Sequence, residues 1–561
     1  MKKATRSEGD SIHSMVSMLP TLPALLHHIG SPSPRRKISL LQIAIVLIAG
    51  GAHAVSMAWP FSFGFMQGQP LWWLQLVAIS LLAGQLDAQV SFGAWKRAAW
   101  LGGLFATAML CGTFWWLFIS MHTYGGLAAP LTALAVVLLA AFLGLYYAVA
   151  SAIFVLLAPV KRAQRAMVFA SLWLMAELAR VRFFTGFPWG EGGYAHVDGW
   201  AGALAAWVGV HGLSFLAAFA AAWLVMSLRV HRARWTTALC IVLVSVAVAW
   251  LPVQGGLQIG PAPAEPGILS VTLLQGNIPQ NEKFESGTGV AAALSWYGEQ
   301  LNAARTSLVV APETAIPVLP QQLPEGYWQA LQARFTQGQQ GKQVQQAALI
   351  GVPLGDMTTG YSNSVVGFKP VAAGQSSEPY RYDKHHLVPF GEFIPAGFRW
   401  FTNLMNIPLG DFNRGAVGQP SFDWKGQRLA LNICYEDLFG EELAARFIDP
   451  ALAPTMFVNV SNIAWFGDSV AIDQHLQISR MRALEFSRPM IRATNTGATV
   501  IIDARGQVTQ SLPRLTRGTL TGEVEGRSSM TPYAWWTARF GLWPWWILGL
   551  SVVGFALFKR R

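Results

Sequence analysis

The sequence predicts a mixed fold, in which an eight-helix transmembrane bundle carries one exported α/β domain. Three observations predict it. The 561-residue chain is 53% hydrophobic and only 12% charged, whereas soluble domains average about 25% charged residues. Its apolar residues come in blocks, most of which approach the roughly 20 residues that cross a bilayer as a helix. Between the last two blocks lies a long segment of short β-type runs and helical stretches.

This composition excludes several classes of protein. The low charge and the high apolar share exclude a disordered chain, a collagen, a small disulfide scaffold and a single water-soluble domain. Lysine and arginine number 40 against 29 aspartate and glutamate residues, a formal net charge of +11. The basic residues lie at the ends of the apolar blocks, as topology signals do, so the excess charge favours contact with lipid over nucleic acid.

Seven apolar blocks fill residues 38–252, after a polar leader at 1–37, and an eighth block covers 541–558. Backbone polar groups inside a bilayer must be satisfied within their own segment, so each block is predicted to be a helix. The expected helices of the first seven blocks cover 38–58, 70–87, 99–121, 130–158, 166–180, 203–228 and 236–252.

The positive charges predict how these helices are oriented. The alternate loops at 59–69 and 122–129 contain no lysine or arginine. With eight helices, all the basic clusters fall on the other side, at 35–37, 96–97, 161–165, 229–234 and 559–561. Since basic loops stay in the cytoplasm, both termini are predicted to be cytoplasmic and the segment 253–540 to lie outside.

Residues 262–530 are predicted to form this outer α/β domain. Some of its β-type runs alternate with helices and others follow one another directly, which favours a layered sandwich over a doubly wound sheet. The expected helices are 291–304, 326–335 and 473–485. The expected strands are 269–274, 307–311, 347–352, 364–368, 429–434, 456–460 and 499–503.

Cys434 is the first candidate catalytic residue. The other two cysteines, Cys111 and Cys240, lie in apolar blocks, so Cys434 has no disulfide partner within the outer domain. It stands where an apolar run gives way to polar residues, and Glu313 and Lys384 also end β-type runs. A glutamate can take a thiol proton, and a lysine can lower a thiol pKa and stabilise an oxyanion. The alternative is a buried structural cysteine and two solvated charges at strand ends.

Three motifs surround these residues: PE at 312–313, YDKHHLVPFGE at 382–392 and NICYE at 432–436. They resemble the nitrilase superfamily, whose catalytic set is Glu-Lys-Cys. Membrane helices on both sides of such a domain resemble the bacterial apolipoprotein N-acyltransferase family. Further stretches are similar to that family, at 185–189, 275–280, 465–468 and 492–497.

The resemblance covers nearly everything from Ile38 to the C-terminus, and the leader has no counterpart. The sequence departs from the family pattern in two places. Ile463 stands where an aspartate is usual, and residues 470–473 replace a stretch that usually contains Gly-Pro. Neither departure touches the three candidate catalytic residues.

This resemblance implies a four-layer α-β-β-α domain on the outer leaflet of the bacterial inner membrane. It also implies the final step of lipoprotein maturation, a ping-pong acyl transfer. Cys434 would take a fatty acyl chain from a phospholipid as a thioester. The α-amine of an apolipoprotein's N-terminal diacylglyceryl-cysteine would then take the chain as an amide. Glu313 would be the general base, and Lys384 would hold the oxyanion with the backbone N–H of Tyr435. By analogy, Glu392 and Glu436 would orient the lysine and the amine.

A set of aromatic residues is expected to contact lipid or substrate: Trp189, Phe390, Trp400, Phe401 and Trp465. Trp400 and Phe401 belong to an unusually apolar stretch at 398–409. We expect this stretch to form an arm that dips into the membrane interface and holds an acyl chain. The alternative is a loop that covers the core of the sandwich.

No metal or cofactor is expected, because the sequence contains no H-E-x-x-H motif, no paired C-x-x-C motif and no phosphate-binding glycine loop. The expected partners are a phospholipid donor, a diacylglyceryl-apolipoprotein acceptor and inner-membrane lipids, with no nucleic acid, and the protein is expected to be a monomer. Two other functions stay open. One is a membrane-tethered amidase or nitrilase acting on a small soluble amide. The other is a transporter or receptor with a dead catalytic fold, against which the intact Glu-Lys-Cys set argues.

Overall fold

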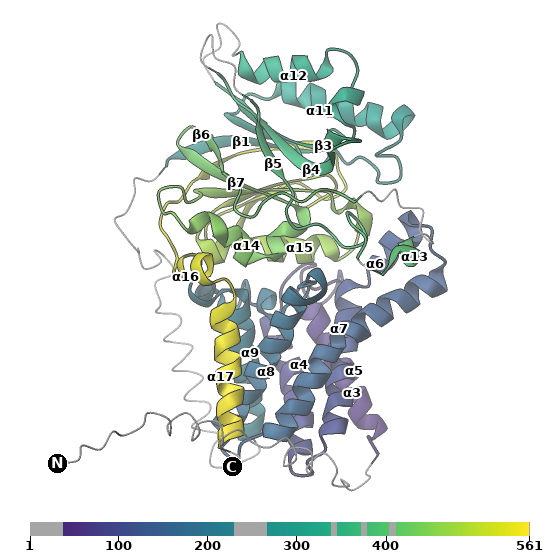
Figure 1. Ribbon diagram of the computed structural model, residues 1–561, viewed down its shortest axis with the longest axis vertical. Coiled ribbons are helices and arrows are strands. Elements are labelled where there is room, and N and C mark those ends of the chain that lie inside the picture. Colours follow the sequence, from purple (N-terminus) through teal and green to yellow (C-terminus); the bar gives the residue numbers. More distant parts are fainter. Residues whose placement is uncertain are drawn as a thin grey trace, which may run out of the picture.

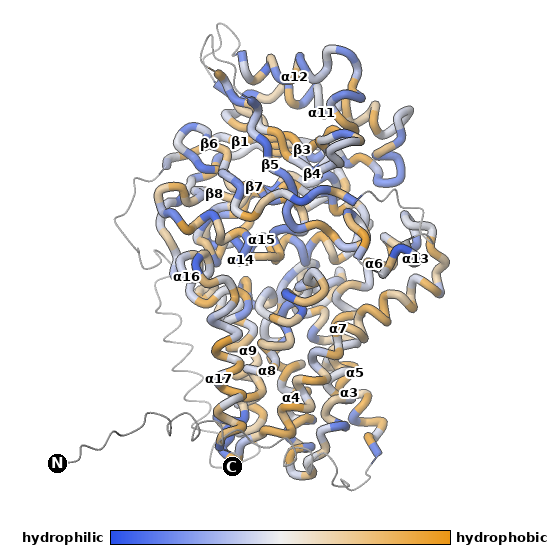
Figure 2. The backbone as a smooth tube through the Cα atoms, in the orientation of Figure 1, coloured by the Kyte–Doolittle hydropathy of each residue, from blue (hydrophilic) through white to orange (hydrophobic). Residues whose placement is uncertain are grey.

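The computed structural model describes residues 37–228, 266–337, 345–371, 378–395, 397–402 and 411–559. It consists of a helical bundle and a two-sheet sandwich mounted on one end of that bundle (Figure 1). The bundle is mainly hydrophobic along its length, whereas the sandwich mixes hydrophobic and hydrophilic segments (Figure 2). The predicted leader, apart from Lys37, and the seventh apolar block at 236–252 lie outside the described residues.

Each of the other seven apolar blocks forms a helix. These are α3 (Leu40–Ser56), α4 (Trp72–Val90), α5 (Trp95–Phe114), α7 (Ala129–Leu157), α8 (Arg162–Arg182), α9 (Ala205–Leu228) and α17 (Trp543–Phe558). Two glycines let helices approach closely, as small residues do in membrane bundles. A Cβ on Gly50 would lie 2.4 Å from the carbonyl oxygen of Phe105, and one on Gly102 would lie 2.0 Å from Ser151 Oγ.

By length and composition, fewer than eight spans are established in the described part of the chain. Two helices, Ala129–Leu157 and Gly202–Leu228, can each cross a membrane alone. Two bent pairs raise the number to four if each pair is one span. In one, α5 meets α6 (Leu117–Ile119) and η1 (Ser120–Tyr124) at 63°; in the other, α16 (Pro532–Phe540) meets α17 at 83°. The helix α8 is less apolar because it contains Glu177 and four arginines.

The sandwich contains two six-stranded mixed sheets. The first has the order β12-β1-β2-β3-β4-β5, and the second has the order β11-β10-β9-β8-β7-β6. In each sheet three neighbouring strands are parallel, β1-β2-β3 and β7-β8-β9, and antiparallel strands flank them. The first sheet comprises β1 (Ile268–Gln275), β2 (Leu308–Val310), β3 (Ala347–Asp356), β4 (Gly360–Phe368), β5 (Tyr380–Asp383) and β12 (Gly518–Glu525). The second comprises β6 (Phe422–Trp424), β7 (Gln427–Ile433), β8 (Met456–Ser461), β9 (Met490–Thr494), β10 (Val500–Ile502) and β11 (Val508–Ser511).

The two sheets pack face to face and helices cover their outer faces. Apolar side chains from both sheets, such as Val271 and Val458, form the central core. The outer face of the first sheet packs against α11 (Ala291–Ala303) and α12 (Tyr327–Thr336). The second packs against α14 (Gly440–Ala444), α15 (Ala471–Phe486) and α16. The predicted layered sandwich, its seven strands and its three helices are therefore confirmed, and β5, β6, β9, β11 and β12 are additional.

The sandwich rests on the bundle through α15. Gln474 Oε1 accepts hydrogen bonds from Trp116 Nε1 at 3.0 Å and Trp189 Nε1 at 2.8 Å, and Gln477 Nε2 donates to the Gly68 carbonyl at 2.8 Å. Gly68 and Trp189 belong to loops that contain little or no lysine or arginine, and Trp116 lies at the bend between α5 and α6. Those loops therefore face the sandwich, and the basic turns before α5 and α8 lie at the opposite end of the bundle.

Candidate active site

Three predicted residues meet where strands end. Glu313 follows β2 by three residues, Lys384 directly follows β5, and Cys434 directly follows β7. Lys384 Nζ lies 3.3 Å from Glu313 Oε1. The Cys434 thiol lies close enough to both groups to interact with their charges. The structure thus brings together, from both sheets, residues that are up to 121 positions apart in the chain.

Cys434 occupies a strained turn between a strand and a helix. It opens the short 3-10 helix η8 (Cys434–Leu438) with a φ of 52°, a left-handed conformation that a residue with a Cβ rarely adopts. The flanking Ile433 and Tyr435 are buried, whereas Cys434 stays partly exposed. The turn therefore places a partly exposed residue between two buried neighbours.

A buried polar network holds this turn from behind. His475 Nε2 lies 2.9 Å from Asp437 Oδ1 and 3.2 Å from the Cys434 carbonyl oxygen. Arg492 Nη2 donates a hydrogen bond to His475 Nδ1 at 3.1 Å. The imidazole Nδ1 is therefore the acceptor, and its Nε2 is the donor. Burial lowers the pKa of His475 despite the attraction of Asp437, which keeps the ring neutral in this arrangement.

Glu313 is held as a carboxylate. Its Oε1 accepts from Asn363 Nδ2 at 2.7 Å and its Oε2 accepts from the backbone N–H of Asn462 at 2.7 Å. Burial by itself would raise the pKa of Glu313, but the attraction of Lys384, the two hydrogen bonds and the attraction of Lys283 outweigh burial and lower it. The group is therefore ionised at neutral pH and can accept a proton.

Lys384 is buried between two carboxylates. Its Nζ donates to Glu392 Oε1 at 2.9 Å as well as to Glu313 Oε1. Glu392 is itself fixed by Asn363 Nδ2 at 2.8 Å and by the N–H of Val388 at 2.8 Å. Burial would lower the pKa of Lys384, but the two carboxylates raise it above its ordinary value. The side chain thus remains an ammonium group, oriented by Glu392.

The Cys434 thiol is protonated at rest. Burial and the nearby Glu313 carboxylate raise its pKa to about 12, and Lys384 opposes them only in part. Lys384 does lower the thiol pKa, as expected, but burial and the Glu313 carboxylate outweigh the attraction of this one ammonium group. A reaction at this sulfur requires a base that removes the proton during attack, and Glu313 can be that base.

Glu436 and Tyr435 lie beside the thiol with other partners. Glu436 accepts from the N–H of Ile433 at 2.6 Å, from the N–H of His385 at 2.6 Å and from Tyr382 Oη at 2.8 Å. It thus ties the end of β7 to the segment that carries Lys384. Tyr435 Oη donates to the carbonyl of Gly186 at 3.2 Å, which joins the turn at Cys434 to the bundle.

The predicted lipid-contact residues lie in different surroundings. Trp189 is only 3% exposed and packs at the junction, with its ring 5.6 Å from that of His475. Trp400, on α13 (Arg399–Thr402), is 64% exposed. The Phe390 ring contacts Phe398 at 5.4 Å, and the Trp465 ring contacts Tyr124 of the bundle at 5.8 Å. The side chain of Phe401 and most of the predicted arm, 403–409, lie outside the described residues.

Sequence reasoning missed three polar residues of the site: Lys283, Asn363 and Asn462. Lys283 Nζ donates to the Glu313 carbonyl oxygen at 3.2 Å. The sequence could have indicated two of them, because Lys283 follows the family-like motif at 275–280 and Asn462 precedes the family-like motif at 465–468. Asn363 lies within the strand β4 and no motif marks it. In the described part of the chain, no group of three or more His, Cys, Asp or Glu side chains is arranged to hold a metal ion.

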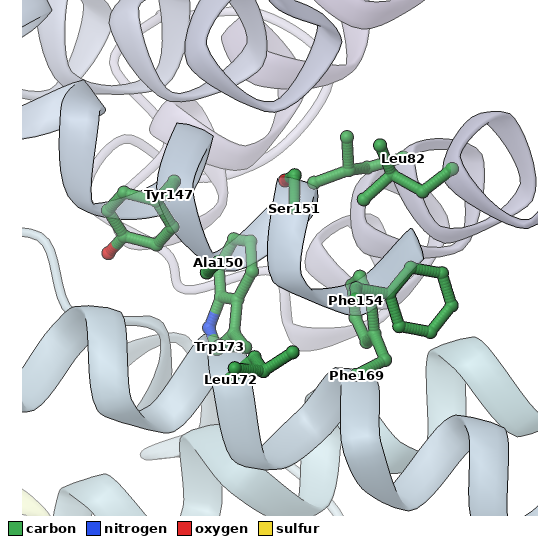
Figure 3. Close-up of a pocket in the computed structure, with 9 residues that line it drawn as sticks. Leu82, Tyr147, Ala150, Ser151, Phe154, Phe169, Leu172 and Trp173 are labelled. Atoms are coloured by element: carbon green, nitrogen blue, oxygen red, sulfur yellow. The ribbon is translucent and has the colours of Figure 1, made fainter. Parts of the chain in front are cut away.

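A small apolar pocket lies inside the bundle (Figure 3). Residues of α4, α7 and α8 line it, among them Leu82, Phe154 and Trp173. None of its lining residues comes from the sandwich. This pocket is therefore separate from the Glu-Lys-Cys site.

Known proteins match both parts of the chain. The family model for the apolipoprotein N-acyltransferase N-terminal domain matches residues 54–223, and the carbon-nitrogen hydrolase model matches residues 270–533. A protein named apolipoprotein N-acyltransferase from Verminephrobacter eiseniae is 57% identical, over 89% of this chain and 93% of its own length. Two others of that name are similar. The one from Ralstonia nicotianae is 43% identical over 87% and 90% of the two chains, and the one from Bordetella bronchiseptica is 41% identical over 92% and 96%.

Proposed function

This chain belongs to the apolipoprotein N-acyltransferase family, and from that premise we propose how its site carries out the reaction. The protein is an enzyme that N-acylates apolipoproteins, with phospholipid and lipoprotein substrates. We propose that Cys434, Glu313 and Lys384 are its catalytic residues and that the acyl chain passes through a thioester on Cys434.

In the first step, Cys434 attacks the ester carbonyl of a phospholipid. Glu313 takes the thiol proton as the sulfur–carbon bond forms, because the resting thiol is protonated and Glu313 is ionised. Lys384 and the backbone N–H of Tyr435 bind the oxyanion of the tetrahedral intermediate. The intermediate then collapses, Glu313 returns the proton to the leaving alkoxide, and a lysophospholipid departs.

In the second step, the α-amine of the diacylglyceryl-cysteine attacks the thioester carbonyl. Glu313 takes the amine proton, and Lys384 again stabilises the oxyanion. The carbon–sulfur bond breaks, the proton passes to the leaving thiolate, and the amide product departs. A thioester keeps acyl-transfer energy that an amide does not, so this step runs downhill. Water is the competing nucleophile, and a site covered by lipid suppresses hydrolysis by excluding it.

One observation carries this proposal: the ammonium group of Lys384 lies 3.3 Å from the Glu313 carboxylate beside the protonated thiol of Cys434. A soluble amidase could use the same three groups. The contact of Tyr435 with Gly186 favours a lipid substrate, because it puts the residue next to the nucleophile against a loop of the bundle.

We infer a membrane arrangement from the basic turns of the bundle and from the way the sandwich rests on its other end. The protein crosses the bacterial inner membrane eight times, with both termini in the cytoplasm and the sandwich in the periplasm. The units are the leader 1–37, the seven-helix bundle 38–252, the catalytic domain 262–530 and the last helix 541–558. The basic turns at the end away from the sandwich support this orientation. We further propose that the protein acts as a monomer in contact with inner-membrane lipids.

Aromatic residues around the site are proposed to hold the acyl chains. Trp400 is the strongest candidate because a large apolar side chain that is 64% exposed is suited to lipid contact. Phe390 lies in a turn of the segment that follows Lys384, and Trp465 lies in the short 3-10 helix Ile463–Phe466. Trp189 is proposed to act through packing of the junction, and Phe401 as part of the arm.

Incubation with acyl-labelled phospholipid tests the proposed function. We expect label on Cys434 of the purified protein, no label on Cys434→Ala, and release of label as an amide when a diacylglyceryl peptide is added. Phe398→Ala and Trp400→Ala together should slow labelling by long-chain donors. Failure of phospholipid to label the intact protein, with turnover of a small soluble amide instead, would refute acyl transfer and favour the amidase alternative.

A further inference from the structure

Lys283 is a buried lysine that the proposed reaction does not use. Only 2% of its surface is exposed, and its Nζ donates to the carbonyl oxygen of Glu313 at 3.2 Å. Among the described residues, no carboxylate oxygen lies within ion-pair distance of this nitrogen. A buried lysine without a salt bridge is rare because burial penalises its charge. Its position against the general base therefore needs an explanation.

The loop that carries Lys283 is rigidly attached to the site. Asn495 binds both backbone groups of Ile278, accepting from its N–H at 3.0 Å and donating to its carbonyl at 2.8 Å. Gln280 Oε1 accepts from Asn462 Nδ2 at 2.8 Å. The N–H of Asn462 binds Glu313 Oε2, so one chain of contacts fixes the loop and the base together.

Packing holds the backbone of Lys283 as well. A Cβ on Gly289 would lie 2.1 Å from the Glu282 carbonyl oxygen and 2.8 Å from Lys283 Cα. Only a glycine allows this close approach of the following turn. The backbone that carries the Lys283 side chain is therefore held in place by the following turn.

We propose that Lys283 is a positioning residue for acyl transfer, which fixes the backbone of Glu313 and whose positive charge keeps the Glu313 carboxylate ready to accept the thiol proton. This inference rests on the proposed role of Glu313 as the general base. In this arrangement two lysines act on one base: Lys384 at its carboxylate and Lys283 at its backbone.

The electrostatics of the site agree with this role. Burial lowers the pKa of Lys283 to about 7, against the attraction of Glu313 and Cys434, which favour its charged form. Lys283 and Lys384 together help to hold the pKa of Glu313 low. The titratable groups that face this cluster are the Glu313 carboxylate and the Cys434 thiol beside Lys283, and the Glu392 carboxylate on the far side of Lys384. Glu282 and Glu285, on the same loop, are at least partly exposed.

The sign of the effect follows from the charge. Below neutral pH Lys283 is charged, and its removal raises the pKa of Glu313. Glu313 is then protonated at a higher pH, so the acidic limb of the pH–rate profile moves to higher pH. An opposite charge beside a carboxylate typically shifts its pKa by about one unit or more. We expect an upward shift of about one pH unit for Lys283→Met, and about a tenfold loss of rate below that limb.

The experiment uses the first half-reaction, which avoids the acceptor amine and its own titration. Acyl-labelled phospholipid vesicles are mixed with the full-length enzyme in detergent, and the rate of Cys434 labelling is followed across pH. Lys283→Met removes the charge, and Lys283→Arg keeps it. Lys369→Met is the control, because Lys369 is an exposed lysine that directly follows β4. Thermal unfolding checks each variant. Lys283→Gln, which keeps a donor for the carbonyl, replaces Lys283→Met if that variant does not fold.

The expected result is a shifted acidic limb for the uncharged variant and an unshifted limb for Lys283→Arg and Lys369→Met. The proposal would be overturned if the acidic limb of the pH–rate profile of the uncharged variant stayed at the wild-type pH. It would also be overturned if Lys283→Arg shifted this limb as far as Lys283→Met, because altered packing alone would then explain the slower labelling. In both of those cases wild-type labelling at Cys434 leaves the proposed function intact. No labelling of the wild type would instead reject that function.

Discussion

Replacement of Glu392 by glutamine separates the charge that orients Lys384 from the shape of its side chain. Both carboxylate oxygens of Glu392 only accept hydrogen bonds: Oε1 from Lys384 and Asn363, and Oε2 from the N–H of Val388. A glutamine must turn its NH₂ group toward one of these sets of donors. Whichever way it turns, at least one buried donor loses its partner.

The structure sets the size of the effect. An unpartnered buried donor costs about 1–3 kcal/mol, and loss of one member of a buried ion pair costs about 3–5 kcal/mol. The Glu313 carboxylate still pairs with Lys384 at 3.3 Å, so we expect a loss of about 3 kcal/mol in the free energy of unfolding. Removal of an oxyanion donor slows catalysis by about 10²–10³-fold. Because Lys384 in Glu392→Gln stays charged but less well oriented, we expect labelling of Cys434 to slow by about 10–100-fold.

Two measurements check this expectation on the same protein: unfolding by denaturant and the rate of Cys434 labelling by phospholipid. Glu523→Gln is the matched control, because Glu523 is an exposed glutamate of β12 in the same domain. It should leave both quantities unchanged. A Glu392→Gln enzyme with the wild-type labelling rate would refute the idea that this carboxylate orients Lys384.

Three further predictions follow from the same geometry. Alkylation of Cys434 by iodoacetamide in the resting enzyme should be slow at neutral pH and rise about tenfold per pH unit, because the thiol pKa is about 12; fast, pH-independent alkylation would contradict a protonated thiol. Asp437→Asn should lower the free energy of unfolding by about 3–5 kcal/mol, because it removes the carboxylate charge that pairs with Arg492 Nη1 at 3.5 Å and turns an NH₂ group toward either His475 or Ser479 in a buried network; unfolding at unchanged denaturant concentration would show that this network is not needed. Gly50→Val should destabilise the bundle by about 1–3 kcal/mol because its Cβ would lie 2.4 Å from the Phe105 carbonyl, whereas Gly51→Ala, where no atom lies within 4 Å, should be tolerated in the same thermal-unfolding assay.

The strands that sequence patterns predict all lie inside their sheets, and β9 is the one buried, central strand that was missed. β2 and β8 are buried along their whole lengths, so their side chains read as continuous apolar runs. The strands that were missed lie mainly at sheet edges or are polar. Every residue of β11 is exposed, and β12 is mostly polar yet pairs with β1 over eight residues. That pairing joins segments about 250 residues apart, and no local pattern reports it.

The apolar blocks, the layered sandwich and the positions of Glu313 and Cys434 after apolar strands could be derived from the order of residues, because hydrophobic periodicity and strand boundaries are local properties. Lys384 was marked by the motif around it, although β5, the strand that it follows, was missed. The ionisation of the site could not be derived in this way. The pKa of Cys434 depends on its burial and on charges that come from other strands. The placement of Lys283 behind Glu313 likewise depends on how the loop after β1 packs against the second sheet. These properties depend on the burial of each group and on its distance from groups far away in the chain. Only the tertiary structure sets that burial and those distances.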